Sequence, residues 1–374
     1  MILMTSRRRG SRLLAIVGSA AALVMLAGCS GTGTTNPTSS SPGGAGNADA
    51  QAIVDAALPP ISEWAGPTES PEAATDKTIG IISCAQGAEG CVREAEGATE
   101  AAEALGWQVI NIDGQGDPQR QLAGMNSLLD QGVDAIVLCS INAASIGDGM
   151  SRAQSMDVPV IAVVSPDPEP FGGLASIGPD DTKAGEVLGA YIQTQGGGKI
   201  GVFDHNENPA VAQRAKGFLS VVDGGEGTEV IYNQSVTLAQ IGPAEQQIMS
   251  AFMQANPTGT VDWIYAGFDA MLTPLIQSAE RQGRTELKAV SIDGNLENLG
   301  FIRDGNIEVA TVGYPLEWAG WGAIDNLNRV FAGEEIVDQA VPFRLLTKDN
   351  LPAEGQPYVG DYDFRAEYTA LWGK

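Results

Sequence analysis

Apolar stretches of strand length recur along the chain, and a polar loop and a segment of helical periodicity follow most of them. The predicted strands are Lys77–Cys84, Trp107–Gly114, Asp134–Ser140, Val158–Ser165, Gly198–His205, Thr228–Val236, Asp262–Asp269, Leu287–Gly294 and Ile307–Pro315. The predicted helices between and after them are Cys91–Gly106, Arg120–Gln131, Ser145–Ser155, Ala210–Val222, Ala244–Gln254, Met271–Gly283, Glu297–Asp304 and Leu316–Phe331. Apolar strands that alternate with helices predict doubly wound parallel sheets, covered by helices on both faces.

One stretch, Ser176–Gln195, divides this alternation into two halves of similar length. It contains a strand end, the breaker Gly178-Pro179, and a helix start at Asp180–Thr182. These three side chains can accept hydrogen bonds from free backbone N–H groups, and acids suit the positive end of a helix dipole. We therefore predict a passage between two lobes here and assign the acids a structural, capping role.

The length of the chain indicates two domains or lobes, and its charge argues against binding to nucleic acid. The 374 residues exceed the usual size of one domain. Asp and Glu number 46 against 21 Lys and Arg, and the formal net charge is −25. Nucleic-acid phosphates need basic contacts, so this charge argues against nucleic acid as a partner.

The N-terminus has the pattern of an export signal. Arg7–Arg9 and Arg12 form a basic region, and Leu13–Leu26 is a short apolar run that ends in small residues. Leu26-Ala27-Gly28-Cys29 resembles the lipobox of bacterial lipoproteins, which predicts a signal peptide over residues 1–28 and a lipid anchor on Cys29. An ordinary secretory signal or an uncleaved membrane helix is the alternative, although the run is short for a membrane span.

Residues 29–76 are predicted to be the lipidated cysteine and a flexible leader. Gly31–Asn47 is rich in Ser, Thr, Gly and Pro, which is typical of a disordered tether. Ala48–Leu58 has the pattern of a short helix, and Trp64–Asp76 that of an extended, irregular segment.

Three further cysteines remain, namely Cys84, Cys91 and Cys139. Export permits disulfides, and the short separation of Cys84 and Cys91 predicts a bridge that closes a small loop. Buried free thiols are the alternative.

Polar and aromatic residues directly after the strands are the candidates for ligand binding, because open α/β sheets bind ligands beyond the carboxyl ends of their strands. A mixture of carboxylates, amides and aromatics suits a polyol, whose hydroxyls need donors and acceptors and whose CH faces pack on rings. The alternative for each residue is a loop or capping role. The candidates are Gln86, Glu89, Asn142, Asp167, Asn206, Phe268, Asp269, Asp293, Tyr314 and Trp318, from a wider set that includes Asp113, Ser140, Ser165, Asp204, His205 and Asn295.

Enzyme motifs are missing from the sequence. His205 is the one histidine, so no site with several histidine ligands is possible. The chain has no nucleophile elbow, no P-loop and no glycine-rich dinucleotide motif after a strand. We therefore predict a binding protein rather than an enzyme, without a cofactor or a metal.

Several pieces of the chain, taken in order, resemble the type I periplasmic sugar-binding proteins of ABC transporters, in their ribose-binding-like branch. They include KTIGIIS, EGATEAAEALGWQV, LLDQGVDAIVLCSIN, VPVIAVVS, SIGPDDTKAGEVLGAYI, AQRAKGF, IYAGFDAM, AVSIDGN and VATVGYP. The resemblance covers Lys77 to about Leu346, and a lipobox fits the same family.

The resemblance implies two lobes joined by three hinge crossings, near Gly178-Pro179, Tyr314-Pro315 and Arg344-Leu345. Lobe one would comprise residues 77–178 and 315–344, and lobe two residues 179–314 and 345–374. It also implies hinge closure on a small ligand, most simply a monosaccharide or related polyol, followed by delivery to an ABC permease. We expect an exported, lipid-anchored monomer on the outer face of the cell membrane or in the periplasm.

The resemblance further assigns ligand contacts. Arg214 matches the family's ligand-binding arginine, with a surface helix charge as the alternative, and Asp293 matches its second-lobe carboxylate. Phe268 and Tyr314 stand where amide residues are common. The family's Asp-Arg pair after the fourth strand is Val164-Ser165 here, with Asp167 as a possible substitute, and the usual aromatic residues of the first loop are absent.

Three functional hypotheses follow. The first is a lipid-anchored receptor that supplies a sugar-like solute to an ABC importer. The second is a sensory receptor of the same fold for a sugar-like signal. The third, which the missing catalytic motifs disfavour, is an extracellular α/β enzyme.

Overall fold

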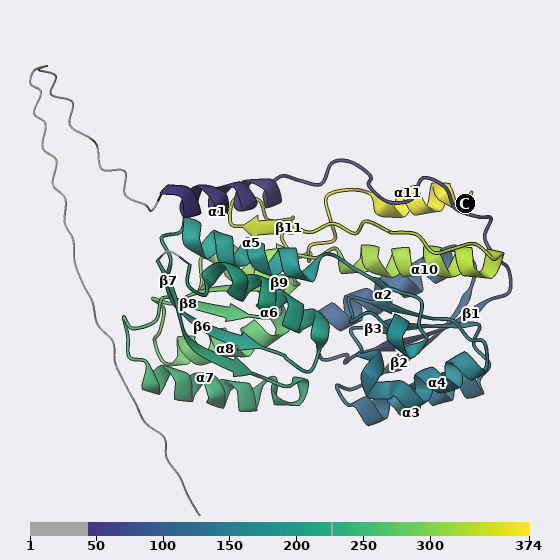
Figure 1. Ribbon diagram of the computed structural model, residues 1–374, viewed down its shortest axis with the longest axis horizontal. Coiled ribbons are helices and arrows are strands. Elements are labelled where there is room, and N and C mark those ends of the chain that lie inside the picture. The colour runs from purple at the N-terminus through teal and green to yellow at the C-terminus, as the bar shows by residue number, and fades with distance from the viewer. Residues whose placement is uncertain (1–43, 226) are drawn as a thin grey trace, which may run out of the picture. The chain divides into compact units, whose positions relative to one another are not determined.

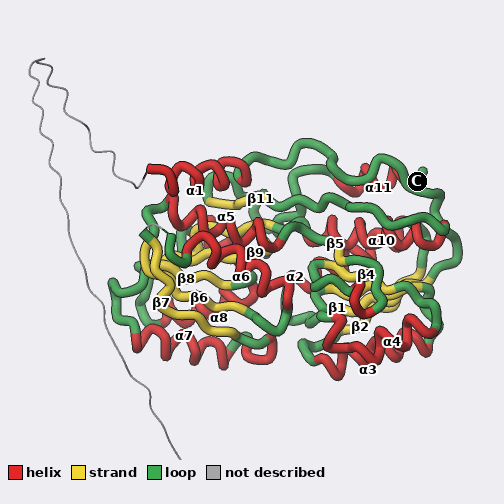
Figure 2. Tube along the Cα trace, in the orientation of Figure 1, coloured by secondary structure: helices red, strands yellow, loops and turns green. Residues whose placement is uncertain are grey.

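A computed structural model describes residues 44–225 and 227–374, which contain two α/β lobes (Figure 1). Each lobe has one sheet, parallel throughout in one lobe and parallel except for one strand in the other. Helices lie on both faces of each group of strands (Figure 2). The predicted fold class is therefore confirmed.

The lobe-one sheet has five parallel strands in the order β2-β1-β3-β4-β5. They are β1 (Thr78–Ser83), β2 (Gln108–Asp113), β3 (Ala135–Cys139), β4 (Val160–Val163) and β5 (Ser176–Ile177). The helices of this lobe are α2 (Glu89–Ala104), α3 (Pro118–Asp130), α4 (Gly147–Ser155) and α10 (Leu316–Ala332). The short 3₁₀ turns are η1 (Ala143–Ile146) and η2 (Glu169–Phe171).

The lobe-two sheet has six strands in the order β11-β10-β9-β8-β6-β7, of which β11 is antiparallel. They are β6 (Gly198–Asp204), β7 (Thr228–Ser235), β8 (Trp263–Ala266), β9 (Lys288–Asp293), β10 (Glu308–Gly313) and β11 (Arg344–Thr347). The helices are α5 (Asp181–Thr194), α6 (Pro209–Val222), α7 (Pro243–Ala255), α8 (Asp269–Arg281) and α9 (Leu296–Asp304), with the 3₁₀ turn η3 (Leu238–Gln240).

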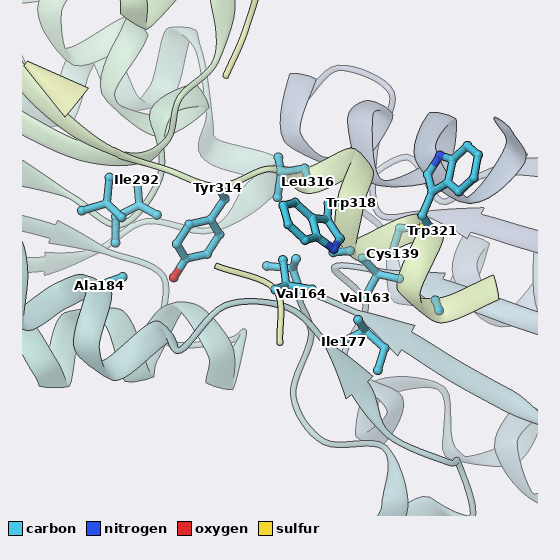
Figure 3. Close-up of a cluster of buried hydrophobic side chains, with 14 of the residues drawn as sticks. Cys139, Val163, Val164, Ile177, Ala184, Ile292, Tyr314, Leu316, Trp318 and Trp321 are labelled. Atoms are coloured by element: carbon cyan, nitrogen blue, oxygen red, sulfur yellow. The ribbon is translucent and has the colours of Figure 1, made fainter. Parts of the chain in front are cut away.

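Alternation along the strands divides the apolar core into layers. Ile81 belongs to the core that also contains residues of α2 and α10, whereas its neighbour Ile82 belongs to the core with residues of α3 and α4. Successive strand residues point to opposite faces, so both faces of the buried strands are apolar. The core that contains residues of α2 and α10 also contains residues of α5 and α6, so it continues from lobe one into lobe two. Figure 3 shows Tyr314, Leu316 and Trp318, which lie along this connection.

The chain passes between the two sheets three times. It goes from β5 to α5 through Gly178-Pro179, and from β10 to α10 through Tyr314-Pro315. After α10, which packs on α2, residues 333–343 lead back to β11 beside β10. The site lies beside these passages, as described below.

The described part of the leader is packed rather than flexible. Helix α1 (Gly44–Ala57) lies against α5 and β11 (Figure 1). Further along, the Trp64 ring stacks on Trp318 with centroids 5.3 Å apart, and the Ser70 hydroxyl donates to Asp325 at 2.7 Å. The physical reason for this difference from the expectation is the apolar side of the leader, which includes Trp64 and the buried Val54.

The C-terminal tail also differs from the expected assignment of residues 345–374 to lobe two. Helix α11 (Phe364–Leu371) packs on α10 of lobe one. Phe364 stacks on Trp318, and Trp372 stacks on Trp321 with centroids 5.2 Å apart. These aromatic contacts bury α11 against lobe one, whereas Tyr358, earlier in the tail, packs with Leu299 and Ile302 of α9 in lobe two.

Candidate ligand-binding site

Strand ends from both sheets meet around one pocket. Ser140 follows β3, Val164 follows β4 and Asp293 ends β9, and all three line the pocket. Their φ angles are positive, at 52°, 44° and 135°. Non-glycine residues rarely adopt this region, least of all a β-branched residue such as Val164, and such strain clusters at functional sites.

This pocket, which we call the deep pocket, has about 500 Å³ of empty space including the solvent at its mouth. Lobe one contributes Cys84, Ala88, Gly90, Cys91, Glu94, Ser140 and Val164, and lobe two contributes His205, Asn208, Val211, Arg214, Leu238, Phe268, Ala270 and Asp293. A wider outer pocket shares Ser140, His205, Asn208 and Leu238 with it.

Arg214 is the cationic group of the deep pocket. Its helix α6 begins after Asn208, whose side-chain oxygen accepts from the N–H of Ala210 at 2.9 Å. The buried guanidinium donates from Nε to Asp181 at 2.7 Å and from Nη1 to Asp293 at 3.1 Å. Two carboxylates therefore hold Arg214 in one orientation at the pocket wall.

Glycines bring these groups together. Gly185 of α5 and Gly217 of α6 face the backbone of the opposite helix, so neither position has room for a Cβ atom. The close crossing of α5 and α6 places Asp181, in the first turn of α5, within reach of Arg214. Tyr314 completes the arrangement, because its hydroxyl donates to Asp181 at 3.0 Å and its ring lies 4.7 Å from the Arg214 guanidinium.

The Asp293 carboxyl, at the end of β9 in lobe two, is a hydrogen-bond acceptor in the pocket wall that faces lobe one. Burial raises the pKa of this carboxyl to about 7, although the nearby Arg214 lowers it. One oxygen, Oδ1, binds Arg214, while Oδ2 faces Gly90 of α2 across the cleft. Near neutral pH this carboxyl can therefore gain or lose a proton.

Glu94 is a buried carboxyl on the lobe-one wall. It lies on the same face of α2 as Gly90 and Cys91, four and three residues earlier. Oε1 accepts from the Ser140 hydroxyl at 2.8 Å, and Oε2 is buried without a hydrogen-bond partner in the described part of the chain. Burial raises the pKa of Glu94 well above its usual value, although Ser140 lowers it.

His205 contributes an acceptor to both pockets. Its Nδ1 lies 2.9 Å from the Val236 carbonyl oxygen. Because a carbonyl only accepts, Nδ1 carries the proton and Nε2 is left as an acceptor. Burial lowers the pKa of His205, so the ring is neutral at pH 7. Phe268 lies edge-on to this ring, with centroids 6.3 Å apart, and forms an apolar wall.

Arg93 joins the lobe-one helices to the segment around the hinge. The guanidinium is buried and donates to both carboxylate oxygens of Glu317, at 2.8 and 2.9 Å. It also donates to four oxygens of lobe two and the passage, which are Asp293 O, Asn295 Oδ1, Tyr314 O and Tyr358 O. This contact holds the strained backbone of Asp293 in place.

The structure brings several candidates together. Arg214, Phe268 and Asp293 line the deep pocket. Asn142 lines the outer pocket, and its amide donates to the Glu207 carbonyl of lobe two at 3.4 Å. Glu89 accepts from the N–H of Leu296 at 2.8 Å, which links α2 to the start of α9 across the cleft.

Three candidates are buried elsewhere and need correction. Asp269 accepts from Ser291, from Thr311 and from the N–H of Asn295, so it ties strands to loops behind the pocket. Tyr314 is fully buried and positions Arg214 rather than lining the pocket. Trp318 lies in the aromatic cluster with Trp64.

Three other candidates are exposed and lie outside both pockets. Gln86 lies on a separate surface groove formed with residues of α2. Asp167 accepts from the N–H of Glu169 and shapes its own turn. Asn206 is exposed next to Asp204, and its N–H donates to the Ser235 hydroxyl. A position directly after a strand does not determine whether a side chain points into the pocket or into solvent.

Sequence reasoning missed Glu94 and Asn208. Both lie in or at the start of a helix and not directly after a strand. Asn208 before Pro209 is a recognisable helix cap, and Glu94 is an acid on the otherwise small and apolar face of α2 with Cys91. These two patterns were the available signals.

The remaining expectations concern covalent groups and metals. Cys84 and Cys91 form a disulfide with Cα atoms 5.7 Å apart, and Cys139 is a buried free thiol. Over residues 44–374, Glu226 apart, no cluster of His, Cys, Asp and Glu is placed to hold a metal. The same residues contain no helix that is long and apolar enough to cross a membrane. Cys29 and the predicted signal peptide lie outside the described residues.

Comparisons with known proteins agree with this geometry. The family model for the periplasmic binding protein domain matches residues 79–335. The ribose import binding protein of Bacillus subtilis is 24% identical over 292 residues, which are 76% of this chain and 92% of that protein. The xylitol-binding protein of Mycolicibacterium smegmatis is 26% identical over 273 residues, 68% of this chain and 73% of that protein.

A solved structure has the same fold. The crystal structure of an ABC transporter solute-binding protein from Mycobacterium smegmatis with bound glycerol superposes with a TM-score of 0.68. It is 24% identical and covers 75% of this chain and 99% of its own.

Proposed function

Because the chain belongs to the periplasmic binding protein family, we propose that it is an extracytoplasmic receptor that binds a sugar or related polyol for an ABC importer. The observation that carries this proposal is the deep pocket between the lobes. Polar groups of Arg214, Asp293 and His205 line it together with the apolar ring of Phe268. Donors and acceptors beside a ring suit a hydroxylated ligand.

The names of similar proteins support this ligand class. The relatives reported above are named for ribose and for xylitol, and the solved structure holds glycerol. All three are small and rich in hydroxyl groups. Members of the family are binding proteins, which fits a receptor without a catalytic role.

The ligand would be enclosed by closure about the three passages between the sheets. We propose lobe boundaries at 77–178 with 315–344 and at 179–314 with the tail as far as β11. Closure excludes water and strengthens polar contacts in the pocket. The two wall carboxyls, Glu94 and Asp293, come from different lobes, so a ligand that contacts both would favour the closed form.

Membrane attachment and delivery complete the proposal. The lipobox supports a lipid anchor on Cys29, which would hold a monomeric receptor on the outer face of the cell membrane. The partner would be the permease of an ABC transporter, as in the family.

A ligand screen tests the function. We expect ribose, xylitol or myo-inositol to raise the thermal midpoint of the full-length chain in detergent, because a ligand of the native state stabilises it by mass action. Asp293→Asn should weaken the best ligand at least tenfold, about 1.4 kcal/mol, in calorimetric titration. Midpoints that respond to amino acids or nucleosides but to no carbohydrate or polyol would contradict the proposal.

A further inference from the structure

The carboxyl end of β4 offers no charged group to the deep pocket. Val164 lines the pocket with an apolar side chain, and the Ser165 hydroxyl donates to the Val163 carbonyl while it accepts from the N–H of Ile141. Asp167, the nearest acid along the chain, is exposed and outside the pocket. A polar contact from lobe one must therefore come from another element.

Helix α2 supplies that contact through Glu94. The side chain is 2% exposed and lines the deep pocket. Ser140 fixes Oε1 at 2.8 Å, which leaves Oε2 as a buried oxygen with no partner among the described residues. A buried polar atom without a hydrogen-bond partner destabilises the fold, so a role in contacting a ligand accounts for its presence.

The position of Glu94 is held by its surroundings. Gly97, one turn later in α2, faces the backbone of Glu317 in α10 and leaves no room for a Cβ atom. Next to Glu94, Arg93 binds Glu317 with two hydrogen bonds. The helix is thus fixed against α10, and the Glu94 carboxyl is preorganised at the pocket wall.

The other polar groups of the pocket are mostly acceptors. Asp293 Oδ2 and His205 Nε2 can accept, and the Glu94 carboxyl, whose pKa is raised by burial, can accept or donate through Oε2. Arg214 is the cation at the wall, and Asp181 and Asp293 already neutralise it. Among the described residues that line the pocket there are therefore several acceptors and no cation that is not already paired, which favours ligand hydroxyls or an ammonium group and leaves an anion without a partner.

We propose that Glu94 is the lobe-one residue that contacts the ligand and determines specificity, and that the pocket takes neutral or cationic polyols and rejects anionic ones. The proposal rests on the proposed function, because it assigns a role within the same pocket. Ligand hydroxyls donate to Glu94 from one side and to Asp293 from the other. A phosphate or carboxylate on the ligand would face both carboxyls across the cleft.

The test compares two substitutions in α2 of the full-length chain. Glu94→Met keeps the length of the side chain and removes both oxygens, whereas Glu96→Met changes an exposed acid on the opposite face of the helix. The probes are ribose, xylitol and myo-inositol as neutral polyols, glucosamine as a cation, and gluconate and ribose 5-phosphate as anions. Titration calorimetry measures affinity, and thermal midpoints without ligand report folding.

We expect Glu94→Met to weaken the best neutral or cationic probe at least tenfold and to raise the midpoint of the ligand-free protein. Glu96→Met should leave the affinity unchanged, and neither anion should bind the native chain. If the role of Glu94 is purely structural, the substitution should lower the midpoint instead, because the Ser140 hydroxyl would lose the 2.8 Å bond to Glu94 and keep only the longer one, at 3.3 Å, to the Val164 carbonyl.

Two results would overturn the proposal. If a polyol binds and Glu94→Met keeps full affinity, or if an anion binds best, the role of Glu94 is wrong while the receptor function stands. If no neutral or cationic polyol binds the native chain, the proposed function fails and the role of Glu94 fails with it.

Discussion

At the scale of single residues, buried acids set how the protein responds to pH. Glu245 is fully buried on the apolar face of α7, which it shares with Met249 and Phe252. Burial raises its pKa from 4.5 to about 8. The unfolded chain loses this proton near pH 4.5, whereas the folded chain keeps it to about pH 8. The free energy of unfolding therefore falls as the pH rises through this window.

Replacement of Glu245 by an apolar residue should raise the free energy of unfolding, most strongly above pH 8. We expect Glu245→Met to raise the free energy of unfolding by at least about 1 kcal/mol more at pH 8 than at pH 5. Denaturant unfolding at the two pH values measures the difference, with the exposed Glu103→Met as a control. An equal gain at both pH values would show that Glu245 does not hold its proton in the folded state.

How far the site could be predicted differs between residues. Arg214 and Asp293 could be found because they lie in short motifs that resemble the family, and both line the pocket. Asp269 directly follows a strand in the same way, but its carboxyl turns to Ser291 and Thr311. The direction of a side chain depends on partners far along the chain, which position after a strand does not reveal.

At the scale of elements, the leader connects parts of both lobes. Helix α1 packs on α5 of lobe two, while Trp64 and the residues after it pack on α10. The N–H of Ala74, for example, donates to the Asn328 side chain at 2.9 Å. The leader precedes residues 79–335, which match the family model.

Removal of the Trp64 ring should detach the leader from α10. The ring stacks on Trp318 and lies edge-on to Tyr368 at 5.1 Å, and its Nε1 donates to Pro67. We expect Trp64→Ala to lower the free energy of unfolding by about 1–3 kcal/mol, because a half-buried indole and its stacking are lost.

Denaturant unfolding measures this change, and the neighbouring exposed Glu63→Ala serves as the control. Identical stability of Trp64→Ala and the native chain would mean that the leader contributes nothing to the fold.

Strands and helices were easier to predict than the packing of the leader and of α11. Apolar runs such as Thr78–Ser83 and Ala135–Cys139 are buried on both faces of a parallel sheet, so their sequence pattern is strong. The leader and α11 depend instead on single aromatic residues, among them Trp64 and Trp372, that pack on α10. Contacts between distant segments leave no periodic pattern in either segment.

At the scale of the whole molecule, a few hydrogen bonds cross the cleft at the entrance to the pocket. The Asn208 amide donates to the Ser140 carbonyl at 3.5 Å, and Asn142 donates to the Glu207 carbonyl. Outside the two pockets, the Glu89 carboxylate accepts from the N–H of Leu296 at 2.8 Å, close in the sequence to the Arg93 contacts with Asp293 and Asn295. This N–H lies at the start of α9, where the helix dipole favours a negative partner.

Opening of the cleft would break the Glu89 contact, so its loss should act on ligand release. We expect Glu89→Ala to weaken the best polyol about two- to tenfold, in line with about 0.5–1.5 kcal/mol for one hydrogen bond. Faster dissociation should account for the change, because the contact forms only after the lobes meet. Stopped-flow binding measures both rates, with Glu96→Ala as the control. A slower association at an unchanged dissociation rate would place Glu89 in the encounter with the ligand instead of in the closed form.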